Sequence, residues 1–295
     1  MTDAVRPRRS ILYMPGSNAR AMEKARSLPA DGLILDLEDA VAPEAKASAR
    51  EQVISALKQG GFGQRELIVR VNAQGTEWWR DDLAALATAR VEPDAILFPK
   101  IDSPEHLLVA IDALDSAGCV DSIPVWIMAE TPRCILQIYA IASAHPRLAG
   151  IVLGTSDLAK DTRVRHTPDR LGFIAALNLC VYAARANGLV VIDGVHLDLE
   201  DDAGLAAACL QGRDLGFDGK SLIHPRQIEA ANTAFAPDAA ELASARQIID
   251  AHEAASAAGQ GVVVVNGRLV EALHVEEARR TLALAAAIAA LGEDQ

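Results

Sequence analysis

Short runs of β-forming apolar residues alternate with longer amphipathic stretches along most of this 295-residue chain. Such alternation is typical of parallel strands joined by helical crossovers. The expected strands are residues 10–14, 33–36, 67–71, 95–99, 125–129, 150–153, 189–192 and 219–223. The expected helices are residues 19–27, 42–58, 78–89, 104–117, 135–143, 170–187 and 202–215. About eight such units, in a chain of barrel length, favour a (β/α)8 TIM barrel over an open doubly wound sheet.

The pattern changes after the eighth unit. Helices are expected at residues 225–231 and 240–257, followed by a strand at 262–265, the pair Asn266-Gly267 and a helix at 275–291. Asn-Gly between apolar runs is a strong hairpin signal. We therefore expect a barrel over residues 1–232 and a C-terminal extension over residues 233–295, suited to a lid or a subunit contact.

The formal net charge of −12 argues against nucleic acid or a membrane surface as a partner, because both would repel so acidic a protein. No apolar run reaches the roughly 18 residues of a membrane span, and the apolar stretch behind the basic N-terminus is too short for a signal peptide. A cytoplasmic protein is expected. The four cysteines are widely spaced, without the short spacings of zinc sites, and are expected to be reduced.

Polar residues gather where the expected strands end, and in a barrel these positions share one rim. They are Asp36, Glu38, Asp39, Arg70, Asn72, Lys100, Glu130, Asp157, Asp193, Lys220 and His224. A charge at the end of a buried strand is costly unless it is paired or used. As a set they indicate an active site, although His224 also fits a simple cap on the eighth strand.

Glu130 and Asp157 each follow an apolar run, one strand–helix–strand unit apart, so they are expected to converge from neighbouring strands. Two carboxylates suit a hard cation such as Mg²⁺, with coordination positions left open for a 2-oxo acid. The alternative is an ordinary ion pair of each acid with Arg133 or Lys160, three residues further on.

Arg70 offers a planar guanidinium group that matches a carboxylate or a developing enolate. Its structural alternative is a pair with Asp36, Glu38 or Asp39 from the adjacent strand. The two interpretations are compatible, because a neighbouring acid would also hold the guanidinium in place.

Short motifs along nearly the whole chain resemble, in order, the signatures of the citrate lyase beta-subunit and malyl-CoA lyase family, CoA-ester lyases of the HpcH/HpaI aldolase type. The motifs are SILYMPG at 10–16, DLEDAV at 36–41, VRVN at 69–72, FPK at 98–100, AETPR at 129–133, LGTSDLA at 153–159 and GKSLIHP at 219–225. Each is weak alone, but their order makes the resemblance specific.

The resemblance implies a (β/α)8 barrel that uses Mg²⁺ to cleave or form a carbon–carbon bond. The substrate would be a 3-hydroxyacyl-CoA such as malyl-CoA or citramalyl-CoA, and the other side of the reaction an acyl-CoA and a 2-oxo acid. A homotrimer or homohexamer is also implied, with the C-terminal tail over a neighbouring barrel. Matched residue by residue, the resemblance implies Glu130 and Asp157 as metal ligands and Arg70 as the catalytic and substrate-binding arginine. It implies further substrate contacts at Glu130, Gly154 and Thr155. Lys24 matches a residue that contacts the CoA phosphates.

One position departs from the family pattern. In the lyases a catalytic aspartate follows the tail hairpin, whereas here Gly267-Arg268-Leu269-Val270 precedes Glu271. Glutamate has the same acid chemistry on a stem one methylene longer, so the resemblance implies Glu271 as a catalytic proton donor with altered reach. The change also leaves room for a different reaction, or for a solvated hairpin residue.

The expected function is a Mg²⁺-dependent CoA-ester lyase. Three alternatives stay open: a malyl-CoA thioesterase, a citrate lyase beta subunit acting on a carrier-protein thioester, and a non-catalytic CoA-binding protein. Lys100 and Lys220 also raise a Schiff-base aldolase, which would need a desolvated lysine, although nothing in the sequence marks either one.

Overall fold

The computed structural model describes residues 5–120, 122–257, 263–265 and 267–293. Its internal contacts divide the chain into two compact units. One is formed by Arg8–Phe235 and the other by Met1–Pro7 together with Ala236–Gln295.

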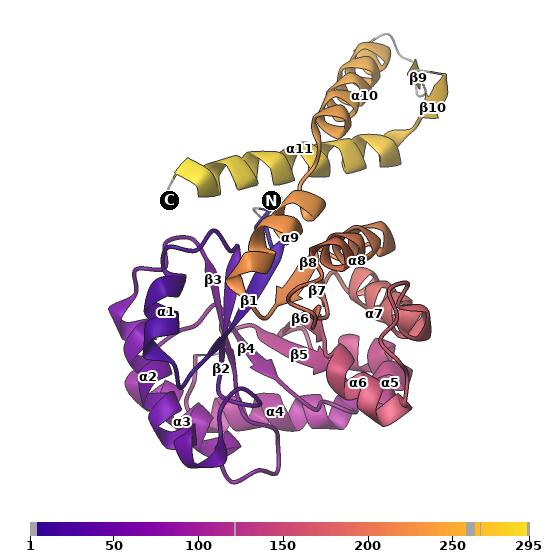
Figure 1. Cartoon of the computed structure of the whole chain (residues 1–295). Coiled ribbons are helices and arrows are strands. Elements are labelled where there is room, and N and C mark those ends of the chain that lie inside the picture. Colours follow the sequence, from indigo (N-terminus) through magenta and orange to yellow (C-terminus); the bar gives the residue numbers. More distant parts are fainter. Residues whose placement is uncertain (1–4, 121, 258–262, 266, 294–295) are drawn as a thin grey trace. The chain divides into compact units, whose positions relative to one another are not determined.

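The larger unit is a closed barrel of parallel strands surrounded by helices, which confirms the predicted TIM-barrel fold (Figure 1). The strands are β1 Ser10–Pro15, β2 Gly32–Asp36, β3 Glu66–Arg70, β4 Ala95–Phe98, β5 Val125–Ala129, β6 Leu148–Leu153, β7 Val190–Asp193 and β8 Gly219–Leu222. β1 pairs in parallel with both β2 and β8, which closes the ring.

Helices connect the strands and cover the outside of the barrel (Figure 1). They are α1 Ala19–Ala25, α2 Lys46–Gln59, α3 Trp79–Ala89, α4 Pro104–Ser116, α5 Pro132–Ala142, α6 Thr155–Thr162, α7 Ile174–Ala186, α8 Asp202–Leu215 and α9 Ile228–Phe235, with the 3₁₀ turns η1 Pro43–Ala45, η2 Leu171–Phe173 and η3 Pro225–Gln227. The sequence does not predict α6, because its segment is short and mostly polar.

Successive side chains of a strand point alternately into the barrel and out toward the helices. The packed interior covers one face and the helices cover the other, so the strands are buried on both faces. The inward cluster contains Ile11, Ile34, Ile68, Ala95, Leu97, Trp126, Met128, Val152 and Ile192. Gly150 has to be a glycine, because an added Cβ would lie 2.4 Å from the Trp126 ring. Because apolar side chains fill the interior, a site can form only beyond them, at the polar carboxyl ends of the strands.

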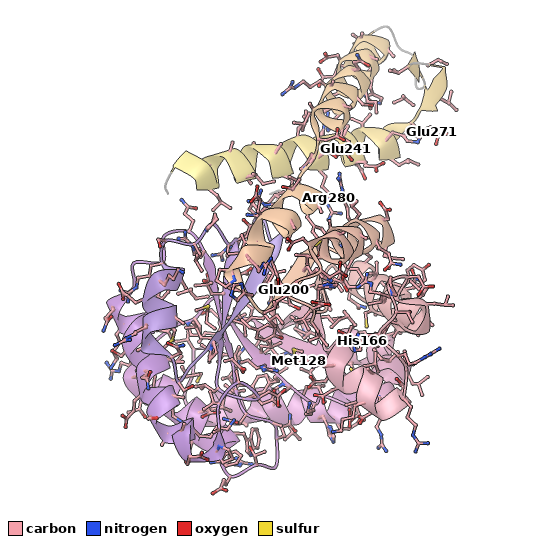
Figure 2. All side chains as sticks on the ribbon, in the orientation of Figure 1. Met128, His166, Glu200, Glu241, Glu271 and Arg280 are labelled. Carbon is pink, nitrogen blue, oxygen red and sulfur yellow. The ribbon has the colours of Figure 1, made fainter. Side chains whose placement is uncertain are left out.

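The smaller unit contains α10 Ala239–Ala257, the antiparallel strands β9 Val263–Val265 and β10 Arg268–Val270, and α11 Ala272–Glu293. α10 packs against α11. Gly267 has a positive φ of 78°, as a tight hairpin requires, while the predicted turn residue Asn266 lies outside the described residues. Figure 2 shows Glu271 at the junction of β10 and α11.

Within the described part of the chain, every helix is too short or too polar to cross a membrane. The cysteines Cys119, Cys134, Cys180 and Cys209 are buried and unpaired, which agrees with the expectation that they are reduced.

Candidate active site

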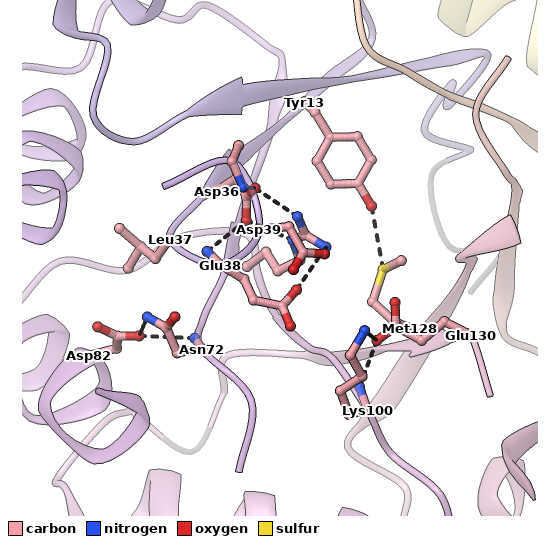
Figure 3. Close-up of polar contacts among 12 residues, drawn as sticks. Tyr13, Asp36, Leu37, Glu38, Asp39, Asn72, Asp82, Lys100, Met128 and Glu130 are labelled. Carbon is pink, nitrogen blue, oxygen red and sulfur yellow. Dashed lines mark hydrogen bonds and ion pairs between the residues drawn. The ribbon is translucent and has the colours of Figure 1, made fainter. Parts of the chain in front are cut away.

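A pocket of about 320 Å³ opens at the carboxyl ends of the barrel strands. It is lined by Tyr13, Asp36, Asp39, Ala40, Arg70, Met128, Glu130, Leu153, Gly154, Thr155, Ser156, Asp157, Val195, Leu197 and Ile223. The pocket therefore has a charged side, made by the acids and Arg70, and an apolar side. Figure 3 shows how several of these side chains face one another.

Glu130 and Asp157 converge on one cation, the ammonium group of Lys100. The Lys100 Nζ lies 3.3 Å from Glu130 Oε1 and also forms a short hydrogen-bonded ion pair with Asp157. The backbone N–H of Lys100 donates to Glu130 Oε1 at 2.8 Å. The predicted alternative of pairs with Arg133 and Lys160 is not found among the described residues, where both of these side chains are exposed.

The charges of Glu130 and Asp157 favour a cation between them. Burial raises the pKa of Glu130, and the positive charge of Lys100 opposes that rise. Burial alone would lower the pKa of Lys100, but Glu130 and Asp157 raise it above its ordinary value. Lys100 also has a left-handed backbone conformation with φ 56°, an uncommon one for a residue with a side chain. Such strain is often found at functional sites.

The donor set at this point fits Mg²⁺. Mg²⁺ prefers oxygen ligands and usually keeps several waters, so one or two carboxylates with substrate oxygens are enough to hold it. In the described residues no group of three or more His, Cys, Asp or Glu side chains gathers, so an ion here would depend on Glu130 and Asp157. Thr155 Oγ1 is a nearby buried oxygen without a hydrogen-bond partner among the described residues.

Gly154 brings strand β6 and helix α6 close to Glu130. Its N–H donates to the carbonyl of Ala129 at 3.0 Å, and an added Cβ would lie 2.4 Å from the Glu130 Cβ. Immediately after it, α6 begins at Thr155 with its first N–H groups directed toward the pocket end of the helix. A helix N-terminus favours anions, so this corner suits a substrate carboxylate.

Arg70 is held by the acids that the sequence offered as its structural partners. Its Nε and Nη2 donate to the two oxygens of Asp36 at 2.6 and 2.7 Å, and its Nη1 lies 2.8 Å from Glu38 Oε2. The guanidinium also stacks over the Tyr13 ring at 5.0 Å. These contacts fix its direction and leave it in the pocket wall.

Glu38 has an unusual environment beside this guanidinium. Burial raises the pKa of Glu38 to about 8, although the charge of Arg70 opposes the rise. Asp36 takes the two most direct hydrogen bonds of Arg70, so Glu38 is only partly compensated.

Two predicted rim residues lie elsewhere. Asp193 is fully buried between the barrel and α8, where it accepts hydrogen bonds from Arg170 and from Lys220 Nζ at 2.8 Å. Lys220 is only 1% exposed and carries this ion pair, so it is not placed to form a Schiff base with a substrate. Ile192 faces the barrel interior, and its successor Asp193 therefore faces outward.

The remaining predicted residues lie away from the pocket lining. His224 has a structural role, but it caps the turn η3 that follows β8, by accepting from the N–H of Arg226, and not the strand itself. Lys24 is exposed in the last turn of α1. Glu271 is exposed in the smaller unit, where its carbonyl accepts from the first turn of α11.

Sequence reasoning missed most of the apolar lining and two polar residues, Tyr13 and Ser156. Tyr13 and Met128 point into the barrel from β1 and β5, and Val195, Leu197 and Ile223 come from loops after β7 and β8. The two-residue period of β1 would have placed Tyr13 on the same face as Ile11, which fills the interior.

The chain is similar to known proteins over most of its length. The sequence pattern of the HpcH/HpaI aldolase/citrate lyase family matches residues 9–225. The chain is 51% identical over 290 residues to a (3S)-malyl-CoA thioesterase of Cereibacter sphaeroides, covering 98% of this chain and 99% of that protein. It is 36% identical over 285 residues to the citrate lyase subunit beta of Escherichia coli, covering 95% and 94%.

A solved structure is similar over nearly the full length as well. The protein CitE of Mycobacterium tuberculosis, in complex with magnesium, acetoacetate and coenzyme A, aligns with a TM-score of 0.74 and 28% identity, covering 94% of this chain and 97% of that one. Magnesium binding is thus present among similar structures.

The likeness to a thioesterase corrects the expected reaction. A carbon–carbon lyase was the main prediction, and it is wrong in view of the full-length similarity to (3S)-malyl-CoA thioesterases. The motifs that carried the resemblance lie in a barrel shared by relatives with either name, so they did not separate carbon–carbon cleavage from hydrolysis.

Proposed function

The chain belongs to the HpcH/HpaI aldolase/citrate lyase family, and from this membership we propose that it is a Mg²⁺-dependent thioesterase. Its substrate would be a 3-hydroxyacyl-CoA thioester of the (3S)-malyl-CoA type. The full-length 51% identity to a protein of that name carries the proposal. The pocket supports it, because converging carboxylates and a fixed arginine suit a small, anionic acyl group.

Glu130 and Asp157 are the proposed metal ligands, since they already hold one cation between them. When bound, Mg²⁺ supplies a Lewis acid for a substrate oxygen. Arg70 would bind the acyl carboxylate or developing negative charge, with its direction fixed by Asp36. The N-terminus of α6 at Gly154 and Thr155 would bind the same carboxylate together with Arg70.

Two further residues, which lie outside the pocket lining, are proposed to contact the CoA part of the substrate and to transfer a proton. Lys24 remains the proposed contact for the CoA phosphates. Glu271, from the tail of a neighbouring subunit, remains the proposed group for proton transfer, and in hydrolysis it would take a proton from the attacking water. Glu271→Gln should then lower kcat, whereas Glu276→Gln in the exposed first turns of α11 should leave it unchanged.

Product analysis tests the proposed reaction directly. Malyl-CoA incubated with the protein and Mg²⁺ should give free CoA and malate, separated by chromatography. Acetyl-CoA and glyoxylate as the products would overturn the thioesterase proposal.

A metal-ligand variant tests the proposed site in the same assay. Glu130→Gln should lose at least about 10²-fold in rate and its response to Mg²⁺, because the variant lacks one of the two carboxylates that would hold the ion and the Lewis acid it would supply. Glu51→Gln on the exposed face of α2 is the matched control and should retain both. A fully active Glu130→Gln protein would sink the metal assignment.

A carrier-protein thioester is a second candidate substrate, favoured by the 36% identity to a citrate lyase subunit beta. Turnover of the acyl group on a carrier protein, at a rate well above that on free CoA, would support it.

A further inference from the structure

Tyr13 presents a phenol hydroxyl to the pocket with a weak partner. The side chain points inward from β1, and the register pairs Tyr13 with Ile34, one inward layer below Asp36. Its hydroxyl lies 3.4 Å from the Sδ of Met128 (Figure 3). Both residues line the pocket. The Tyr13 hydroxyl is therefore a hydrogen-bond donor with only a weak acceptor, and it faces the pocket in which the substrate is proposed to bind.

The weakness of this contact is chemical. Tyr13 is half-buried, and its contact with Met128 is weak because a thioether sulfur is a poor acceptor compared with any oxygen. Burial also raises the pKa of Tyr13, so the phenol keeps its proton and can donate. The stacked guanidinium of Arg70, 5.0 Å from the ring, holds the side chain in one orientation.

The surroundings indicate which substrate oxygen would accept from this donor. Arg70 and the Glu130–Asp157 pair provide charged groups for the acyl carboxylate and the metal. Tyr13 is uncharged, and its neighbour Met128 belongs to the apolar side of the pocket with Leu153. A neutral donor beside an apolar wall suits the neutral carbonyl of a thioester better than a carboxylate.

We propose that the hydroxyl of Tyr13 donates a hydrogen bond to the thioester carbonyl oxygen and stabilises the negative charge that forms there. This assignment deepens, and depends on, the thioesterase function proposed above. Water forms a C–O bond to the carbonyl carbon, and the C=O electron pair moves onto the oxygen beside Tyr13. Collapse then breaks the C–S bond, and the CoA thiolate receives the proton that the water lost. Such a donor acts mainly in the transition state, since charge develops only then.

Tyr13→Phe removes only the hydroxyl and keeps the ring that stacks on Arg70. The expected result with malyl-CoA and saturating Mg²⁺ is a fall in kcat of about 10²-fold, with KM within about two-fold of wild type. The thermal unfolding temperature should stay at the wild-type value, which excludes a folding defect. Ser55→Ala is the control, because it removes an exposed hydroxyl group from the outer helix α2, and it should retain wild-type kcat.

Binding of pyruvate by calorimetry, with Mg²⁺ present, separates a contact to the thioester from a contact to the acid. Pyruvate is a 2-oxo acid without a thioester, so Tyr13→Phe should bind it as tightly as wild type does. Weakened pyruvate binding, a wild-type kcat, or a raised KM with unchanged kcat would each overturn the role of Tyr13. A wild-type protein that hydrolyses no thioester would instead overturn the proposed function, and the role of Tyr13 with it.

Discussion

At the scale of single residues, Glu38 gives the protein a pH-dependent stability. Its pKa is about 8 in the folded chain, against an ordinary value of 4.5, because burial disfavours the charged form. Between these values the folded state holds a proton that the unfolded state has released. The contribution of Glu38 to the free energy of unfolding is therefore fully present below pH 4.5 and is lost as the pH rises through about 8.

Glu38→Gln has nearly the same shape as the protonated glutamic acid and cannot ionise, so it removes the loss of stability at high pH. We expect the free energy of unfolding of the variant, relative to wild type, to increase from about pH 5 to pH 9 by on the order of 2 kcal/mol. Urea unfolding in metal-free buffer, followed by tryptophan fluorescence, measures it, since all three tryptophans lie in the barrel unit. Glu51→Gln should follow the wild-type profile, and parallel profiles for wild type and Glu38→Gln would contradict the burial of a charge at this position.

At the scale of elements, the junction of β6 and α6 leaves no room for a side chain. Gly154→Ala places a Cβ 2.4 Å from Glu130 Cβ and 2.8 Å from its Oε2, so Glu130 or α6 has to move. We expect a lower unfolding temperature and a loss of most of the stabilisation that added Mg²⁺ gives, measured by thermal unfolding with and without the ion.

A control glycine separates metal binding from general stability. Gly75 has a positive φ of 82° with open space around the position of a Cβ, so Gly75→Ala adds backbone strain without a clash. It should lower the unfolding temperature and keep the full response to Mg²⁺. Equal responses of the two variants to Mg²⁺ would show that Gly154 does not position Glu130.

The strands also show how far the sequence could predict the site. Inward residues Ile34, Ile68 and Met128 are each followed two positions later by a site residue, Asp36, Arg70 or Glu130. The apolar run thus predicts where a strand ends, but it does not predict which of its side chains point into the barrel. Parallel strands are apolar on both faces, so no polar alternation marks the direction of each side chain.

That missing alternation explains both the error at Asp193 and the omission of Tyr13. Asp193 ends an apolar run as Glu130 does, yet it lies one position after an inward residue and packs against α8. Tyr13 lies inside an apolar run and carries its polar atom at the far end of a ring. Helix α6 was missed for a different reason, because its eight residues are too few to show helical periodicity.

At the scale of the whole molecule, two adjacent helices carry an exposed apolar surface. Leu136 and Tyr139 on α5 are 84% and 64% exposed, and Leu179 and Tyr182 on the neighbouring α7 are 43% and 66% exposed. We call these four residues the α5–α7 patch. Copies that each carry a net charge of −12 repel one another, so they should associate through uncharged surface such as this.

Leu136→Asp should therefore weaken the self-association that the family resemblance predicts. Light scattering after size-exclusion chromatography should give a lower mass for this variant than for wild type. Leu210→Asp, at a leucine 51% exposed on α8, is the matched control and should keep the wild-type mass. The same mass for both variants would exclude the α5–α7 patch as the contact.

If Glu130 and Asp157 bind a metal ion as proposed, the ammonium group between them would make metal uptake an exchange of one cation for another. Lys100 neutralises part of the negative charge, so the two acids can lie close together without repelling each other. An incoming divalent ion would have to displace that ammonium group, so its net affinity would be the difference between two attractions to the same acids. Lys100 would thus stabilise the metal-free protein and weaken metal binding, and an anionic substrate that arrives with the ion would supply the missing difference.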